Sequence, residues 1–166
     1  MKDSAPHTFH NLSETAQRIA EARSTSTKIR ICAGYLRSIS DDDDLSLAVQ
    51  FLGEGAFPTL SDKRISIGSR TVSTCAARFC EISYEQVFKP SKTALGSASE
   101  TIEKLMHNIE AGRSKRNPQY LSLAQVADIF EELHRVSSRA DKQKILERSW
   151  TQMTPVEIKY FIRLIR

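Results

Sequence analysis

The chain has 166 residues, of which 40% are hydrophobic and 27% are charged. This composition is typical of a single globular domain that can bury a core. Its apolar runs are too short to span a membrane, and the polar start Met1–Ser4 does not resemble a signal peptide. Cys32, Cys75 and Cys80 have no further Cys or His at metal-site spacing. We therefore expect buried free thiols, a reducing compartment and a cytoplasmic location.

The net charge of +4 is a mild excess, and it is unevenly placed. Residues 1–50 hold 6 basic and 7 acidic residues, residues 51–120 hold 10 and 7, and residues 121–166 hold 8 and 6. Such an excess permits a polyanionic partner without requiring one.

The first third of the chain shows three helical patterns. Phe9–Ala22 carries apolar residues at helical spacing, and the polar run Ser24–Thr27 then ends this pattern and supplies caps for Lys28–Ile39. The acidic run Asp41–Asp44 precedes the apolar segment Leu45–Leu52. Acidic residues favour a helix start, whereas consecutive aspartates splay apart and make a poor divalent-metal site. We therefore interpret the aspartate run as a helix start.

The middle third begins with a loop. Glycine and proline mark residues 53–64 as this loop, and Arg64–Gly68 is the best strand candidate because it alternates briefly. Ser69–Glu81 has the pattern of a helix. Ser83–Gln86 is a capping box for a short helix that we expect to end before Pro90, and we expect a flexible loop over residues 89–98.

The last third is again helical. Ser97–Glu100 is a capping box before Thr101–Ala111, a basic loop follows over residues 112–118, and Ser122–Gln125 caps the next helix. Arg139–Trp150 forms the penultimate helix, with Trp150 facing the core. Together these patterns predict an all-α domain of eight or nine helices over residues 9–166, after a flexible segment at residues 1–8.

The closing segment Thr154–Arg166 has the clearest helix start. Thr154 and Glu157 form a capping box around Pro155 at the first helical position. One face is apolar and the opposite face is basic, so we expect a helix docked by one face. No Gly, Asn or Pro ends the pattern, and we expect that further chain follows in the parent protein. The basic face consists of Lys159, Arg163 and Arg166.

The sequence contains little that indicates an enzyme. It has no phosphate-binding G-x-x-x-x-G-K-S/T loop, no G-x-G-x-x-G and no G-x-S-x-G. His7 and His10 lack a third ligand nearby in the sequence, and His134 has the position of a packed or rim residue. The adjacent Glu131 and Glu132 point in different directions on a helix. We predict no catalytic residue and no metal site.

Basic and small polar residues at helix starts and loops remain as candidate phosphate sites, because free backbone N–H groups beside a cation suit an anion. Taken alone, each such group is more often a solvated cap or loop, because Lys and Arg are common on protein surfaces. The four groups are Ser24–Lys28; Lys63 and Arg64 with Gly68–Arg70; Arg113, Lys115 and Arg116; and Arg139, Lys142 and Lys144.

The order of these segments resembles the N-terminal DNA-binding domain of ATP-dependent DNA ligases, of the bacterial kind. The most specific part is T-P-x-E-x-K-Y-x-x-R at Thr154–Arg163. The resemblance runs from about Phe9 to the end. The other stretches that carry it are Thr25–Lys28; Asp44–Gly53 with Ala56–Pro58 and Ile65–Gly68; Leu121–Leu123 with Val126; and Lys142 with Leu146.

The resemblance implies a helical domain that grips duplex DNA around a nick through phosphates and the minor groove, without reading sequence, in repair, replication or recombination. It implies a covalently linked catalytic domain that uses ATP and Mg²⁺. The family's K-x-D-G adenylation motif does not occur in this chain, which we expect to be inactive alone, without cofactor. We also expect a monomer.

The candidate phosphate contacts follow from the basic groups and the resemblance together. Lys159 and Arg163 have the best motif support, although either could be an ion-pair residue on the helix surface. The alternative function is a helical protein-interaction module, which predicts an exposed apolar groove and no clustering of the basic residues. The candidate contacts are Thr25, Lys28, Gly68, Arg70, Lys142, Lys159 and Arg163.

Overall fold

A computed structural model describes residues 5–166 as an all-α domain, which confirms the predicted fold class. Within these residues the sole β-type pairing is an isolated bridge between Thr8 and Ser122, so Arg64–Gly68 is not a strand. The helical elements are α1 (Phe9–Glu21), α2 (Thr25–Arg37), α3 (Asp42–Gly53), α4 (Ser69–Phe79), the π-helical turn η2 (Tyr84–Phe88), α5 (Lys89–Leu95), α6 (Ala98–Asn108), α7 (Glu110–Ser114), α8 (Leu123–Arg135), α9 (Arg139–Thr151) and α10 (Pro155–Leu164).

Side-chain caps set most of the helix starts. Both halves of the capping box form at Ser122 with Gln125, and again at Thr154 with Glu157. At Asp41 the carboxylate accepts the N–H of Asp44 at 2.9 Å, and three further aspartates fall in the first turn of α3. The aspartate run is therefore part of the helix start, where the macrodipole favours negative charge.

Two segments expected to be loops are helical instead. The expectation of a flexible loop near residues 89–98 is wrong for its first part, because Lys89–Leu95 forms α5 and Pro90 occupies its first turn. Proline is tolerated there because its missing N–H would have no partner within the helix. The short helix α7, Glu110–Ser114, extends into the first three residues of the basic loop expected over residues 112–118.

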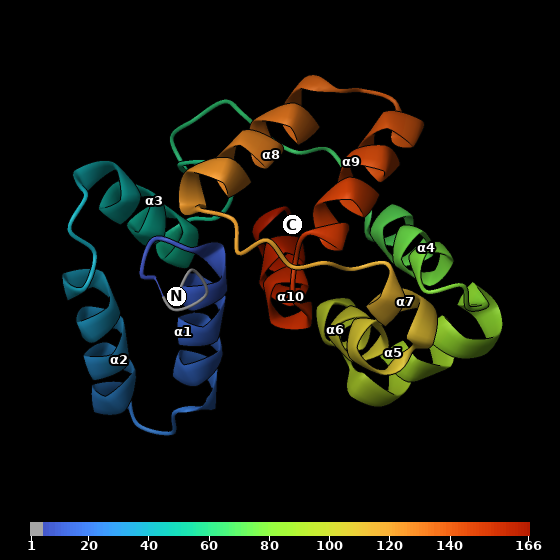
Figure 1. Ribbon diagram of the computed structural model, residues 1–166, viewed down its shortest axis with the longest axis horizontal. Coiled ribbons are helices and arrows are strands. Elements are labelled where there is room, and N and C mark those ends of the chain that lie inside the picture. The colour runs from blue at the N-terminus through green and yellow to red at the C-terminus, as the bar shows by residue number, and fades with distance from the viewer. Residues whose placement is uncertain (1–4) are drawn as a thin grey trace.

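The helices surround α10. It lies in the middle of Figure 1, with α1, α2 and α3 on one side, α4 to α7 on the other, and α8 and α9 across the top. Its main packing partners are α6 and α1. The expected basic face of α10 is therefore covered at Lys159, whereas Arg163 and Arg166 of the same face stay exposed.

Aromatic rings form much of the core. Phe51 lies between Phe9 and Phe130, with ring centroids 6.4 Å and 5.5 Å away, and Phe130 stacks on Phe161 at 5.2 Å. Trp150 is fully buried against α4, which confirms its expected core position. These contacts join α1, α3, α8 and α10 into one core.

Residues 1–4 of the expected flexible segment lie outside the described residues, whereas residues 5–8 are held by hydrogen bonds. The Thr8 hydroxyl accepts the N–H of Asn11 at 3.1 Å and is buried. The His7 carbonyl accepts the N–H of Leu123 at 2.9 Å. The Tyr35 hydroxyl donates to the Pro6 carbonyl at 3.2 Å. The ordered domain thus begins before α1.

The three thiols are free, and two of them are fully buried. Burial, with help from the charge of Glu147, raises the pKa of Cys75 to about 12. Burial also raises the pKa of Cys80 to about 11, against the opposing charges of Lys115 and Arg116. Both groups are therefore protonated and unreactive at pH 8 in the folded domain.

We expect a thiol reagent at pH 8 to modify the half-buried Cys32 first and the other two only on unfolding. A Cys32→Ala variant should show almost no fast phase, and guanidinium should make all thiols of either protein react at one rate. Fast modification of Cys75 or Cys80 in the native variant would contradict their burial.

Candidate functional site

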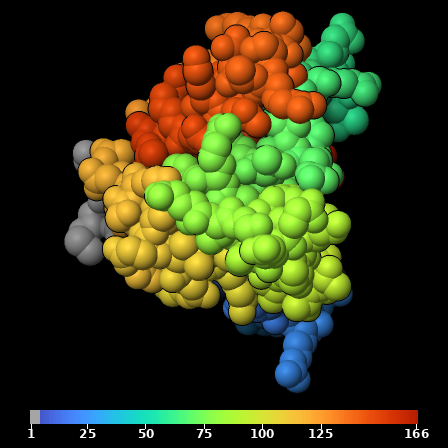
Figure 2. Space-filling model, turned by 90° about the vertical axis from the view of Figure 1, so that its right-hand side faces the viewer, coloured from blue at the N-terminus to red at the C-terminus, as the bar shows by residue number. Residues whose placement is uncertain are grey.

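The helices α4 and α9 pack side by side in the same direction. The Lys142 ammonium donates to the Ser66 carbonyl just before α4. Further along both helices, Arg78 donates twice to one oxygen of Glu147, at 3.0 Å and 2.8 Å. Since later residues of α4 meet later residues of α9, the two N-termini lie on the same side. Figure 2 shows α4 in green beneath the orange-red α9.

Two helix N-termini on one side bring positive dipole ends together, an arrangement that an anion stabilises. The α9 start is capped, because the Ser138 hydroxyl accepts the N–H of Asp141 at 3.1 Å. At the α4 start, Gly68 is the cap, and no side chain of residues 5–166 caps it. The first N–H groups of α4 are thus without a side-chain acceptor.

Two arginines flank this pair of helix starts. The Arg70 guanidinium lies over the Tyr84 ring, 4.0 Å from its centroid, and 3.4 Å from a Glu85 oxygen. Arg139 is exposed and has no ion pair with any residue from 5 to 166. Tyr84 was not foreseen, because only the fold brings η2 beside α4. The feature of the sequence that pointed to Arg139 was its position directly after Ser138, the residue that caps α9.

The loop that leads to Gly68 is fixed by contacts with α8 and α9. Lys63 pairs with Glu131 at 2.6 Å, and the hydrogen bond from this lysine lowers the Glu131 pKa. His134 Nδ1 lies 2.8 Å from the Arg64 carbonyl oxygen, which confirms a packed histidine. Together with the bond from Lys142 to Ser66, these contacts hold the loop in place.

Lys142 is buried, with 8% of its surface exposed. We expected its ammonium to face a phosphate, but in the structure it faces the Ser66 carbonyl, two residues before Gly68. The reason is that the loop 54–68 folds over the first turn of α9 and covers this side chain. Lys142 therefore positions the start of α4.

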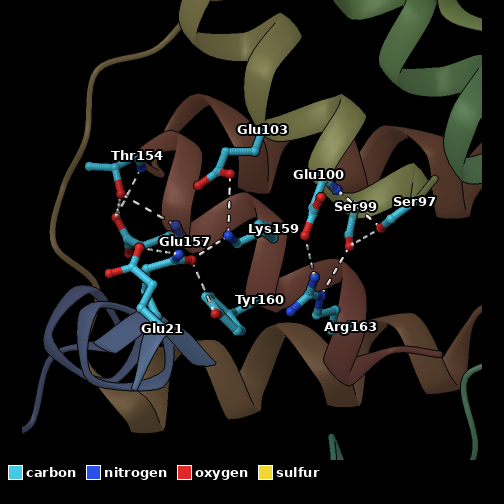
Figure 3. Close-up of polar contacts among 11 residues, drawn as sticks. Glu21, Ser97, Ser99, Glu100, Glu103, Thr154, Glu157, Lys159, Tyr160 and Arg163 are labelled. Atoms are coloured by element: carbon cyan, nitrogen blue, oxygen red, sulfur yellow. Dashed lines mark hydrogen bonds and ion pairs between the residues drawn. The ribbon is translucent and has the colours of Figure 1, made fainter. Parts of the chain in front are cut away.

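Lys159 is also enclosed, with 4% of its surface exposed. Its ammonium bonds to the Gln17 side chain on α1 and lies 3.3 Å from Glu103 on α6, as Figure 3 shows for the Glu103 pair. The expected solvent-facing position of Lys159 is thus wrong, since α1 and α6 flank α10 on both sides.

Arg163 joins the same seam between α10 and α6. Its guanidinium donates to the Ser99 hydroxyl at 3.0 Å and lies 3.5 Å from Glu100, and the side chain remains 40% exposed. The Tyr160 hydroxyl donates to Gln17 at 3.2 Å, and burial raises its pKa. With the Thr154 cap, the T-P-x-E-x-K-Y-x-x-R motif therefore fixes α10 between its neighbours.

The third basic group has internal partners. Arg116 donates to the carbonyls of Gly112, Met153 and Met106, at 3.0 Å, 3.2 Å and 2.9 Å. Lys115 donates to the Phe79 carbonyl at 2.6 Å. These carbonyls lie near helix ends, where they lack partners within the helix. Lys115 and Arg116 therefore supply the hydrogen-bond donors that these carbonyls need.

The α2 start is exposed and stands apart. Ser24 caps it by accepting the N–H of Thr27 at 3.2 Å, and Thr25 and Lys28 face solvent. In Figure 1, α2 lies at the opposite end of the long axis from α4. The seven candidate contacts therefore do not form one surface, although Gly68 and Arg70 do share the site beside α9.

None of the helices in residues 5–166 combines the length and apolar character that a membrane crossing needs. Within the same residues, no group of three or more His, Cys, Asp or Glu side chains could hold a metal ion.

Comparison with known proteins gives one result for the whole domain. A search of curated proteins returned no match. A family model described as DNA ligase N terminus matches residues 8–166, which is nearly the entire chain. The order of motifs and the all-α fold agree with this match. The chain therefore belongs to the family of N-terminal domains of ATP-dependent DNA ligases.

Proposed function

We propose that this domain binds nicked duplex DNA through its phosphates, without reading the base sequence, and holds it for a linked catalytic domain. The observation that carries this proposal is the parallel pair of α4 and α9, whose N-termini face the same side with Arg70 and Arg139 beside them. Two positive helix ends and two guanidinium groups match the spaced negative charges of a DNA strand.

The residues have separate roles in this proposal. The N–H groups after Gly68 and the cations of Arg70 and Arg139 contact phosphate, while Lys142 holds the loop in position. Lys159 and Arg163 hold α10. Thr25 and Lys28 belong to a separate contact at the other end of the domain.

The chemistry of joining is assigned to the linked domain. Joining requires a lysine that accepts AMP from ATP, and K-x-D-G does not occur in these 166 residues. ATP and Mg²⁺ therefore belong to the catalytic domain, and this domain contributes binding and orientation.

The alternative of a protein-interaction module receives mixed support. This alternative predicted that the basic residues do not cluster, and the candidate basic residues indeed lie on different surfaces. Its expected apolar surface has less support, because the large exposed hydrophobic residues among those described come from different elements. They are Ile29, Val49, Leu60 and Val87. Membership of the ligase family favours DNA.

A salt titration tests the proposal. The wild-type domain should bind nicked duplex with an affinity that falls steeply with salt. Arg70→Gln with Arg139→Gln should lower the slope of log K against log salt by about 1.8, or about 0.9 for each lost phosphate contact.

The control variant removes two exposed charges elsewhere, Lys92→Gln on α5 and Lys104→Gln on α6. Its slope should stay close to that of the wild type. A flat salt dependence for the wild type, or equal slopes for the two double variants, would argue against this site.

A further inference from the structure

The helical hairpin of α1 and α2 carries a local excess of positive charge. Residues 9–37 hold five basic residues and two acidic residues, and Asp41–Asp44 follow beyond the end of α2. The five basic residues are Arg18, Arg23, Lys28, Arg30 and Arg37.

These cations differ from most others in having no ion pair. Within residues 5–166, ten Lys or Arg side chains pair with a carboxylate, and none of the ten lies on the hairpin. Of the two acidic residues of α1, Glu21 accepts a hydrogen bond from Gln17 at 2.7 Å and Glu14 lies 3.6 Å from His10. The α2 segment itself contains no acidic residue. None of the five cations of the hairpin thus forms an ion pair with a carboxylate of residues 5–166.

The hairpin also presents these charges outward. Tyr35 is the one fully buried residue of α2. Arg30 and Arg37 are both exposed and lie on one face, because seven residues make two turns. Ile29 between Lys28 and Arg30 is 62% exposed. Figure 2 shows the blue turn between α1 and α2 projecting below the body of the domain.

We propose that the outer face of α2 is a second electrostatic contact, which binds the phosphates of duplex DNA away from the nick. This inference rests on the proposed function and extends its separate contact at Thr25 and Lys28 along α2 to Arg30 and Arg37. A duplex offers a negative charge about every 1.7 Å along its axis, which complements a row of unpaired cations. Contact with Arg30 and Arg37 would neutralise two phosphates.

The size of the domain sets the length of DNA that this contact needs. A compact chain of this length measures about 40 Å across, which corresponds to about 12 base pairs at 3.4 Å each. Because α2 and the α4–α9 pair lie towards opposite ends of the long axis, a short duplex held at one end would not reach the other.

The experiment uses dumbbell DNA with a central nick in a stem of about 10 or about 24 base pairs. Arg30→Gln with Arg37→Gln keeps two good helix formers in α2. On the long stem this variant should lower the salt slope by about 1.8 and weaken binding on the order of 10- to 60-fold at 0.1 M salt. On the short stem it should behave like the wild type.

The matched control is again Lys92→Gln with Lys104→Gln, which removes the same charge from α5 and α6. Equal slopes for the hairpin variant and this control on the long stem would overturn the inference. An equal loss on both stems would also overturn it, because the contact would then lie beside the nick. Failure of the wild type to bind either stem would instead reject the proposed function.

Discussion

Replacing Lys159 by alanine should destabilise the domain by about 3–5 kcal/mol, the usual result of removing one partner from a buried ion pair. The Lys159 ammonium is enclosed between Glu103 on α6 and Gln17 on α1. Without it, Glu103 keeps a partly buried charge, with 26% of its side chain exposed, and α10 loses contacts to both neighbours. Thermal unfolding should shift down on the order of 10 °C.

Two further variants separate the lost charge from lost packing. Lys159→Met keeps the aliphatic stem and should cost less than alanine, and Lys159→Met with Glu103→Gln should recover part of the loss because no unpaired charge remains. The matched control is Lys104→Ala on the exposed face of α6, which should change stability by less than about 0.5 kcal/mol. Equal effects of Lys104→Ala and Lys159→Ala would contradict the internal role of Lys159.

The local parts of this fold could be predicted from the sequence. A serine or threonine three residues before a glutamine or glutamate specifies a helix start by itself, and both complete capping boxes were foreseen at Ser122 and Thr154. Glu100 behaves differently. Its backbone N–H bonds to Ser97, but its side chain pairs with Arg163 of another helix. A tertiary contact has replaced half of that capping box.

The burial of Lys142 and Lys159 could not be read from periodicity. A pattern with one apolar face assumes that the other face meets water. In α10 the polar face meets α1 and α6, and the lysine becomes an internal cation. The parallel packing of α4 and α9 could not be predicted either, because 70 residues of chain separate their starts in the sequence.

The basic loop near Arg116 illustrates the same limit. Its charges suggested a phosphate site, yet three carbonyls surround the Arg116 guanidinium. Carbonyl groups at helix ends need hydrogen-bond donors, and which cation supplies them is known only once the helices are packed together. Charge in a sequence therefore locates candidates, and the partners in the fold decide which cations remain for a ligand.

Lys142→Met should weaken DNA binding although the ammonium touches no DNA. The substitution keeps the buried stem and removes the donor to the Ser66 carbonyl, so stability should fall by about 1–3 kcal/mol. The loop before Gly68 then loses its tie to α9, and the N–H groups of α4 no longer face the phosphate. Affinity measured well below the unfolding temperature should fall on the order of two- to fivefold, the value of one helix-end interaction.

The salt dependence separates this positioning role from direct contact. An amide N–H carries no net charge, so its loss releases few counterions, and the slope for Lys142→Met should change by less than about 0.5. Arg139→Gln is the matched comparison on the same turn of α9, and it should lower the slope by about 0.9 with little effect on stability. If Lys142→Met instead lowered the slope by about 0.9 at unchanged stability, the ammonium would have to leave Ser66 and bind phosphate. The start of α4 would then reach its DNA-binding conformation only when DNA binds. The contact between Lys142 and Ser66 would be present only in the free domain.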